Sequence, residues 1–251
     1  ILPGLLCIAG ILILSGCTAV YVHPDTPVSI ANMRQTVKYL CEIKPARNYQ
    51  NHVSLEKAVQ YIANQFKECG LTPTIQKFKA AGNEYKNVIA SVGPEKGPRI
   101  IIGAHYDVCG DQPGVDDNAS GIAGLLEMAK YAQKNKDKLK YRVDFVAYCL
   151  EEPPFFGSTQ MGSYIHAKYL HDHKIAIEGM ICLESIGYFN EKPNSQNYPI
   201  AEMSSIYGTK GNFITVVQNN TKGKFSSQIT NLMLKQNFIE TKSFVGSSLL
   251  T

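Results

Sequence analysis

Apolar side chains follow two different periods along the chain. Helical spacing, with apolar residues three or four positions apart, covers residues 29–42, 54–69, 119–133, 159–171 and 226–235. Short alternating or continuous apolar runs, which are typical of strands, cover residues 74–79, 87–92, 99–105, 143–150, 179–186 and 213–217. Strands that alternate with helices in this way predict a three-layer α/β fold around a mostly parallel sheet. Ligands bind such sheets beyond the carboxyl ends of the strands.

The N-terminal segment has the pattern of a secretory leader. No charged residue occurs before Asp25, and an apolar run over residues 5–14 is followed by small residues. Residues 14–17, Leu-Ser-Gly-Cys, resemble the bacterial lipobox, which is cut before a cysteine that then carries lipid. We therefore expect residues 1–16 to be an N-terminally incomplete lipoprotein signal peptide and Cys17 to be lipidated. The alternative is an uncleaved transmembrane anchor, since the uncharged segment is long enough to span a bilayer.

Both interpretations place the rest of the chain outside the cytoplasm. We expect a linker over residues 17–28 and one domain over residues 29–251. The lipid on Cys17 would anchor this domain to a membrane of the bacterial cell envelope, in the periplasm or at the cell surface. An odd number of cysteines lies beyond Cys17, and Cys41 with Cys69 is a possible bridge.

Composition excludes several classes of protein. Hydrophobic residues make up 44% of the chain and charged residues 18%, which excludes a disordered chain and leaves room for a core. The net charge is only +4, and no long basic block or RNA-binding motif occurs, so we expect no nucleic-acid partner.

The first polar cluster closes the strand predicted over residues 99–105. His105 and Asp107 are two positions apart, so their side chains point to the same side of an extended strand. A carboxylate beside a histidine can orient the imidazole ring for metal binding. A structural histidine near a strand end is the alternative.

The second cluster is Gly-Val-Asp-Asp-Asn-Ala-Ser-Gly over residues 114–121, at the start of an apolar helix. Helix capping by Asn118 or Ser120 explains part of it, because polar and acidic side chains favour a helix N-terminus. One acid is enough for capping, so capping does not explain why Asp116 and Asp117 are both present.

The third cluster, Glu151 and Glu152 before two prolines, ends the strand predicted over residues 143–150. A solvated turn is the alternative. Consecutive strand residues face opposite ways, so both carboxylates can point into one site only where the strand breaks, and the prolines enforce that break. Imidazole with several carboxylates suits zinc, and two metals sharing a carboxylate form a hydrolytic site.

In this order, the three clusters together with Leu183-Glu184 resemble the motifs of the co-catalytic di-zinc aminopeptidases. That family includes bacterial leucyl aminopeptidase, aminopeptidase Y and glutamate carboxypeptidase II. The resemblance runs from about residue 54 to residue 188. It implies a phosphorylase/hydrolase-like α/β/α domain with a mixed central sheet and two zinc ions in a complete active site.

The resemblance also implies a role for each residue. His105 would bind one zinc, Asp116 would bridge both, and Glu152 would bind the second. Glu184 falls where many members have a zinc-binding aspartate, and is one methylene longer.

Three further roles concern catalysis and orientation. Glu151 would be the general base, and Asp107 would orient His105 as part of the catalytic machinery. Asp117 would lie outside the metal ligands, after an unusual cis peptide bond between Asp116 and Asp117.

The activity implied is that of a zinc aminopeptidase, a monomer that hydrolyses N-terminal residues of peptides. The first alternative is a glutaminyl cyclase, which has the same fold and one zinc. The second is a lipoprotein that keeps the fold as a non-catalytic binding module, although the presence of Glu151 argues against it.

One departure concerns a late histidine that the family uses as a ligand of the second zinc. No histidine follows His173, and His166, His171 and His173 fall on or just after a helix that precedes Glu184. We expect these three on a solvated helix face, and we expect the chain to be C-terminally incomplete.

Overall fold

A computed structural model describes residues 28–198, 201–219 and 223–246. These residues form two compact units, 28–185 and 186 onward, and each unit is considered by itself. The expected signal peptide over residues 1–16, the lipidation at Cys17 and all but the last residue of the linker lie outside the described residues. Among the helices that are described, none has both the length and the apolar character needed to cross a membrane.

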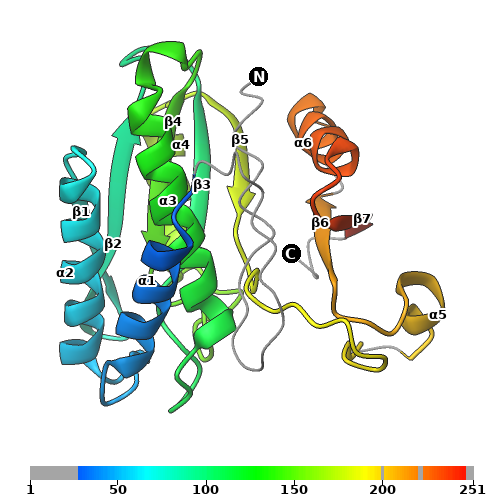
Figure 1. The fold of residues 1–251 in the computed structure, drawn as a ribbon. Helices are drawn as coiled ribbons and strands as arrows, with labels where there is room; N and C mark the ends of the chain where they lie inside the picture. The colour runs from blue at the N-terminus through cyan, green and yellow to red at the C-terminus, as the bar shows by residue number, and fades with distance from the viewer. Residues whose placement is uncertain (1–27, 199–200, 220–222, 247–251) are drawn as a thin grey trace. The chain divides into compact units, whose positions relative to one another are not determined.

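The first unit is built on a five-stranded sheet with the strand order β1-β2-β4-β3-β5 (Figure 1). The strands are β1 (Thr74–Ala80), β2 (Asn83–Val92), β3 (Arg99–His105), β4 (Arg142–Tyr148) and β5 (Ile177–Cys182). The expected mixed sheet is confirmed. Parallel pairing is limited to β3 with β4 and β5, whereas β1 pairs with β2, and β2 with β4, in antiparallel register.

The antiparallel edge follows from a tight turn between β1 and β2. Ala81 and Gly82 are the two residues of this turn, and both have positive φ, 45° and 82°. A two-residue turn with positive φ at both positions is the connection that matches the twist of an antiparallel hairpin. The chain therefore returns directly beside β1 instead of crossing over to form a parallel pair.

Helices cover both faces of this sheet. They are α1 (Ile30–Glu42), α2 (His52–Glu68), α3 (Gly121–Lys134) and α4 (Gly162–Asp172). The helices α1, α2 and α3 lie on one face, where α2 packs on β2 and α3 packs on β3 and β4 (Figure 1). The predicted helices over residues 29–42, 54–69, 119–133 and 159–171 are all present, with ends shifted by at most three residues.

The core lies where β3 and β4 are buried on both faces. Ile101 and Val146 pack with Leu170 of α4 on one side of the sheet. Ile102 and Phe145 are fully buried, and as the adjacent strand residues they face the opposite side, toward α3. The predicted three-layer arrangement therefore describes this unit.

A buried carboxylate ties α1 to α3. Glu127 of α3 accepts hydrogen bonds from the backbone N–H of Ser29, at 2.7 Å, and from Nδ2 of Asn32, at 3.0 Å. We expect Glu127→Ala to lower the free energy of unfolding by about 2 kcal/mol, because two donors lose a charged acceptor. Glu42→Ala, at the exposed end of α1, is the matched control and should cost less than about 0.5 kcal/mol in urea titrations. Equal losses in the two variants would contradict this account.

The second unit contains α5 (Met203–Tyr207), β6 (Phe213–Asn219), α6 (Lys224–Lys235) and β7 (Glu240–Gly246). Strands β6 and β7 are parallel neighbours in a two-stranded sheet, and α6 connects them. The predictions of a strand over 213–217 and a helix over 226–235 are confirmed. Sequence reasoning missed α5, which is too short to show a helical period, and β7, whose first four residues are polar or charged.

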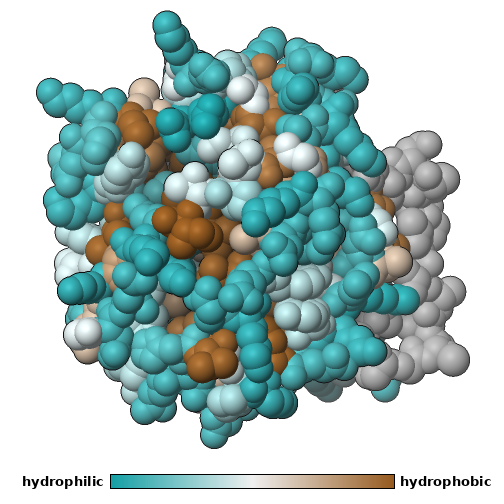
Figure 2. Space-filling model, turned by 90° about the vertical axis from the view of Figure 1, so that its left-hand side faces the viewer, coloured by the Kyte–Doolittle hydropathy of each residue, from teal (hydrophilic) through white to brown (hydrophobic). Residues whose placement is uncertain are grey.

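The face of the first unit that carries α2 and β1 is mainly hydrophilic, and its apolar areas are small and separate (Figure 2). Val53 of α2 and Ile75 of β1 are among the exposed apolar residues here. Single apolar side chains at a protein surface are normal and indicate no partner. The chemistry of the unit lies instead at one edge of the sheet.

Candidate metal centre

Three parallel strands end at the same edge of the sheet, and each leads into a polar residue. His105 is the last residue of β3, Glu151 follows the end of β4, and Glu184 follows the end of β5. Because these strands are neighbours, their carboxyl ends bring the three side chains together. The position predicted from the sequence is therefore the position observed.

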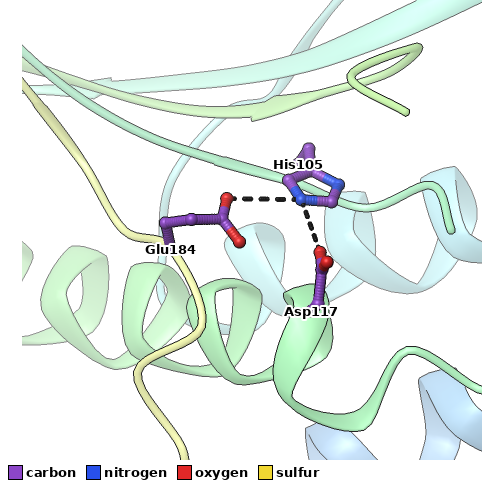
Figure 3. Close-up of side chains that lie close together, drawn as sticks. All are labelled: His105, Asp117 and Glu184. Atoms are coloured by element: carbon purple, nitrogen blue, oxygen red, sulfur yellow. Dashed lines mark ion pairs between the residues drawn. The ribbon is translucent and has the colours of Figure 1, made fainter. Parts of the chain in front are cut away.

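His105 is the centre of this cluster (Figure 3). Its Nε2 lies 3.0 Å from Oδ1 of Asp117, 3.3 Å from Oε2 of Glu184 and 3.7 Å from Oε2 of Glu151. The ring is buried, and Nε2 has no hydrogen-bond partner of acceptable geometry in the described part of the chain. A buried nitrogen surrounded by carboxylates, with no hydrogen bond of its own, has the environment expected of a metal ligand.

Two groups of side chains could each hold a metal ion. The first is His105 with Asp117 and Glu184, and the second is His105 with Glu151 and Glu152. In each group the potential ligand atoms all lie within 4.8 Å of one another. One imidazole with carboxylate oxygens is a donor set that zinc accepts, so the residues present fit the zinc site expected from the sequence.

The structure places the carboxylate of Asp117, one residue later than expected, beside His105. Asp116 was predicted as the shared ligand, but it belongs to neither group, and the carboxylate beside His105 is that of Asp117. The reason is the backbone of the turn Val115–Ser120, in which Asp117 leaves the helical conformation with φ −101° and ψ 95°. The cis peptide bond is likewise one position later than predicted, between Asp117 and Asn118.

Asp107 links the ends of β3 and β4. Its two carboxylate oxygens accept the backbone N–H groups of Glu151 and Glu152, at 3.2 Å and 3.1 Å. Its backbone oxygen lies 3.2 Å from Nδ1 of His105, and its Oδ1 lies 3.6 Å from the same nitrogen. This contact fixes the imidazole so that Nε2 points into the site. The geometry is the one expected for a residue that orients His105.

The site holds several charges close to one buried imidazole, and their pKa values shift accordingly. Burial raises the pKa of Glu151 to about 7, with an opposing effect from His105. Contact with His105 lowers the pKa of Asp117 below its ordinary range. Burial lowers the pKa of His105, but the close carboxylates of Asp107, Asp117 and Glu184 outweigh burial and raise it. A carboxylate with a pKa near neutrality is suited to taking up and releasing a proton.

Asn118 holds Glu184 in place, a role that sequence reasoning missed. Its Nδ2 donates to the backbone oxygen of Leu183 at 2.8 Å and to Oε2 of Glu184 at 3.0 Å. Its Oδ1 accepts the N–H of Gly121 at 3.0 Å, which confirms the capping role considered from the sequence. One buried amide therefore caps α3 and positions a carboxylate from the segment after β5.

The three histidines on or after α4 are not part of the site. His171 and His173 are exposed, as expected. His166 is not on a solvated face: it is buried, and its Nδ1 lies 2.9 Å from the hydroxyl of Tyr148. None of the three belongs to a potential metal-binding group among the described residues.

Buried His166 gives a prediction for the pH dependence of stability. Burial lowers the pKa of His166, so the unfolded chain, with a histidine pKa of about 6.5, binds this proton at higher pH than the folded chain. Neutral His166 therefore contributes its full stabilisation above about pH 6.5. This contribution is lost as the pH falls from there through the lowered pKa of His166 in the folded chain. We expect His166→Gln to remove part of the fall in unfolding free energy below about pH 6.5, measured by urea titration. Exposed His171→Gln is the control, and an equal change there would contradict the assignment.

The five cysteines among the described residues belong to neither potential metal-binding group. Cys41 and Cys69, considered as a possible bridge, are both free thiols, as are Cys109, Cys149 and Cys182. Cys149 is buried, as expected from its apolar strand, whereas Cys182 is exposed on β5.

Comparison with known sequences finds relatives over much of the chain. The chain is 44% identical over 204 residues to the uncharacterised protein YfbL of Escherichia coli K12, a match that covers 77% of this chain and 62% of YfbL. It is 29% identical over 178 residues to leupeptin-inactivating enzyme 1 of Streptomyces exfoliatus, covering 69% of this chain and 39% of that enzyme. The chain thus spans less than two thirds of the length of these relatives.

Solved structures with a similar fold include LapB of Legionella pneumophila, with a TM-score of 0.62 and 23% identity over 88% of this chain and 55% of LapB. A glutaminyl cyclase of Porphyromonas gingivalis has a TM-score of 0.56 and 20% identity, covering 89% of this chain and 85% of that one. A zinc-dependent exopeptidase of Parabacteroides distasonis has a TM-score of 0.54 and 19% identity, covering 87% and 84%. At these identities the likeness shows the fold.

The sequence pattern of one family matches more than half of the chain. The match extends over residues 87–243, and so includes His105, Asp117, Glu151, Glu152 and Glu184. This match identifies the chain as a member of peptidase family M28.

Proposed function

We propose that this chain carries the catalytic site of a zinc-dependent exopeptidase that removes N-terminal residues from peptides. The observation that carries the proposal is the cluster around His105, in which a buried Nε2 faces carboxylates from three separate segments and makes no hydrogen bond of acceptable geometry to any described residue. Membership of family M28 supports zinc as the metal and hydrolysis as the reaction class.

In this proposal His105, Asp117 and Glu184 hold one zinc ion. Glu152, whose carboxylate belongs to the other potential group, would contribute a ligand to a second zinc ion. Bound zinc supplies Lewis acidity, which polarises the scissile carbonyl and makes the attacking water more acidic.

The chain's own residues supply orientation and proton transfer. Glu151 accepts the proton of the attacking water and later donates it to the leaving amine nitrogen, as its position beside His105 allows. Asp107 keeps the backbone of Glu151 and Glu152 in place through two hydrogen bonds, and also orients His105. Asn118 keeps Glu184 directed at Nε2 of His105.

The preference for a free N-terminus follows from charge. The carboxylates of Asp117, Glu151, Glu152 and Glu184 lie close together around one imidazole. The carboxylates that hold zinc would be neutralised by it, and a carboxylate of this group that is not a ligand would pair with the ammonium group at the start of a peptide. A neutral, blocked N-terminus would lose this attraction.

The test is zinc content together with hydrolysis of aminoacyl p-nitroanilides by the full chain, purified without added chelator. The proposal expects bound zinc, release of p-nitroaniline, loss of activity with a chelator, and recovery on adding zinc. N-acetylated forms of the same substrates should react far more slowly. Bound zinc without hydrolysis of any free aminoacyl substrate would contradict the proposal.

The fold shared with glutaminyl cyclase gives the second candidate. Cyclisation of an N-terminal glutamine releases ammonia and leaves the peptide chain intact, so one glutaminyl peptide separates the two reactions. Ammonia release with an intact peptide would support the cyclase, whereas release of the first residue supports the peptidase. Zinc binding with neither product would support a binding module.

A further inference from the structure

An arginine is buried beside the candidate metal centre, outside the residues matched by the family pattern. Arg47 lies in the loop between α1 and α2, and only 1% of its surface is exposed. Burial lowers the pKa of its guanidinium group, which shows how unfavourable this environment is for a charge. Arginine is almost never buried so completely unless its donors are paired.

The guanidinium group of Arg47 is paired with backbone carbonyl groups. Nε donates to the oxygen of Tyr106 at 2.7 Å, and Nη2 donates to the oxygen of Gly114 at 2.9 Å. Nη1 donates to the oxygens of Leu40, at 2.8 Å, and Pro113, at 2.7 Å. Three of these four acceptors belong to the segment that connects β3 to α3.

These acceptors stand at the two ends of loop 106–114. Tyr106 directly follows His105, and Gly114 precedes Asp117 by three residues. Arg47 therefore connects the backbone next to one candidate ligand with the backbone that leads to the other. The separation between His105 and Asp117 depends on where the two ends of this loop lie.

The backbone and the next side chain strengthen the same connection. The N–H of Val108 donates to the backbone oxygen of Arg47 at 3.3 Å, and Nδ2 of Asn48 donates to the oxygen of Gly110 at 2.7 Å. Gly114 has φ 59°, and a Cβ there would lie 2.8 Å from Nη2 of Arg47. The loop is thus held at its start, its middle and its end, with no free space at Gly114.

We propose that Arg47 is a positioning residue, which holds both ends of loop 106–114 and so keeps His105 and Asp117 at a separation that lets them share one metal ion. The inference rests on the proposed function, because it takes these two residues as ligands. Only arginine offers a planar fork of five donors, which can reach carbonyl groups in several directions, whereas lysine offers a single compact ammonium group.

The test is the zinc affinity of Arg47→Lys, measured on the full chain by competition with a chromophoric chelator. We expect the variant to bind zinc about 10–100-fold more weakly, the usual cost of losing a residue that supports metal ligands. Arg99→Lys is the matched control, since Arg99 begins β3 at the opposite end from the site and donates to Asp144 at 2.8 Å. It should change zinc affinity by less than about twofold, even where it lowers stability.

A second measurement does not depend on metal. Amide hydrogen exchange of residues 106–117 in the metal-free protein should be faster in Arg47→Lys than in the wild type, and unchanged in Arg99→Lys. If Arg47→Lys does not fold, Asn48→Ala replaces it, because this variant loses the bond to Gly110, together with the local bond from the N–H of Gln50, and keeps all four bonds of the Arg47 guanidinium group. Asn48→Ala should shift exchange and zinc affinity in the same direction by a smaller amount.

The outcomes separate this inference from the proposed function. If the wild type binds zinc and Arg47→Lys folds, binds it equally tightly and exchanges equally slowly, Arg47 is only a structural residue and the inference is overturned. If the wild type binds no zinc at all, the proposed function fails, and the inference fails with it.

Discussion

Replacing Glu151 with glutamine should lower kcat for aminoacyl p-nitroanilides by about 10²–10⁴-fold, the usual contribution of a general base. The amide keeps the shape of the side chain but cannot accept the proton of the attacking water. Oε2 of Glu151 lies 3.7 Å from Nε2 of His105, farther than the oxygens of Asp117 and Glu184. The zinc that we propose for those two residues and His105 should therefore remain, which metal analysis of the purified variant would show.

Glu178→Gln is the control for this change, because Glu178 is an exposed residue of β5, the strand that leads to Glu184. It removes one carboxylate from the same unit and should leave kcat unchanged. A Glu151→Gln variant that retains zinc and a kcat close to that of the wild type would show that another group accepts the proton. Loss of zinc together with activity would instead identify Glu151 as a ligand.

The parts of the fold that could be predicted are those with a strong local period. The apolar pattern of helix α2 fits a helical period, and the patterns of the buried strands β3 and β4 fit a strand. The bounds of all three elements are close to those expected. Strand β5 was predicted from its apolar sequence, and it is exposed along much of its length. Apolar sequence indicates a strand, but its burial depends on which elements cover it.

The location of the site in the sheet could be predicted more easily than the contacts between its residues. Parallel strands bring their carboxyl ends together, so the convergence of His105, Glu151 and Glu184 follows from topology alone. The contacts of Arg47 could not be found in this way, because its acceptors at residues 106, 113 and 114 are 59 to 67 positions away. No local pattern marks a single charged residue in a loop as one that becomes buried.

Sequence patterns also could not decide whether Asp116 or Asp117 contacts His105. Two adjacent aspartates have identical chemistry, and only the backbone between Gly114 and Gly121 decides which one faces His105. Gly114 is in the left-handed region, and Asp117 and Asn118 leave helical geometry within the turn. This turn places Oδ1 of Asp117 at 3.0 Å from Nε2 of His105.

A pair of single substitutions tests that choice directly. Asp117→Asn should weaken zinc binding by roughly 100-fold or more, because the His105 group keeps only two of its three protein ligands, fewer than catalytic zinc normally has. Asp116→Asn alters the neighbouring residue by the same isosteric change and should weaken zinc binding far less, since Asp116 belongs to neither potential group. Both affinities are measured by chelator competition, and the unfolding free energy of each variant shows whether the turn has been preserved. If Asp116→Asn abolishes zinc binding while Asp117→Asn retains it, the ligand is Asp116, and the turn between Gly114 and Gly121 must rearrange when the metal binds.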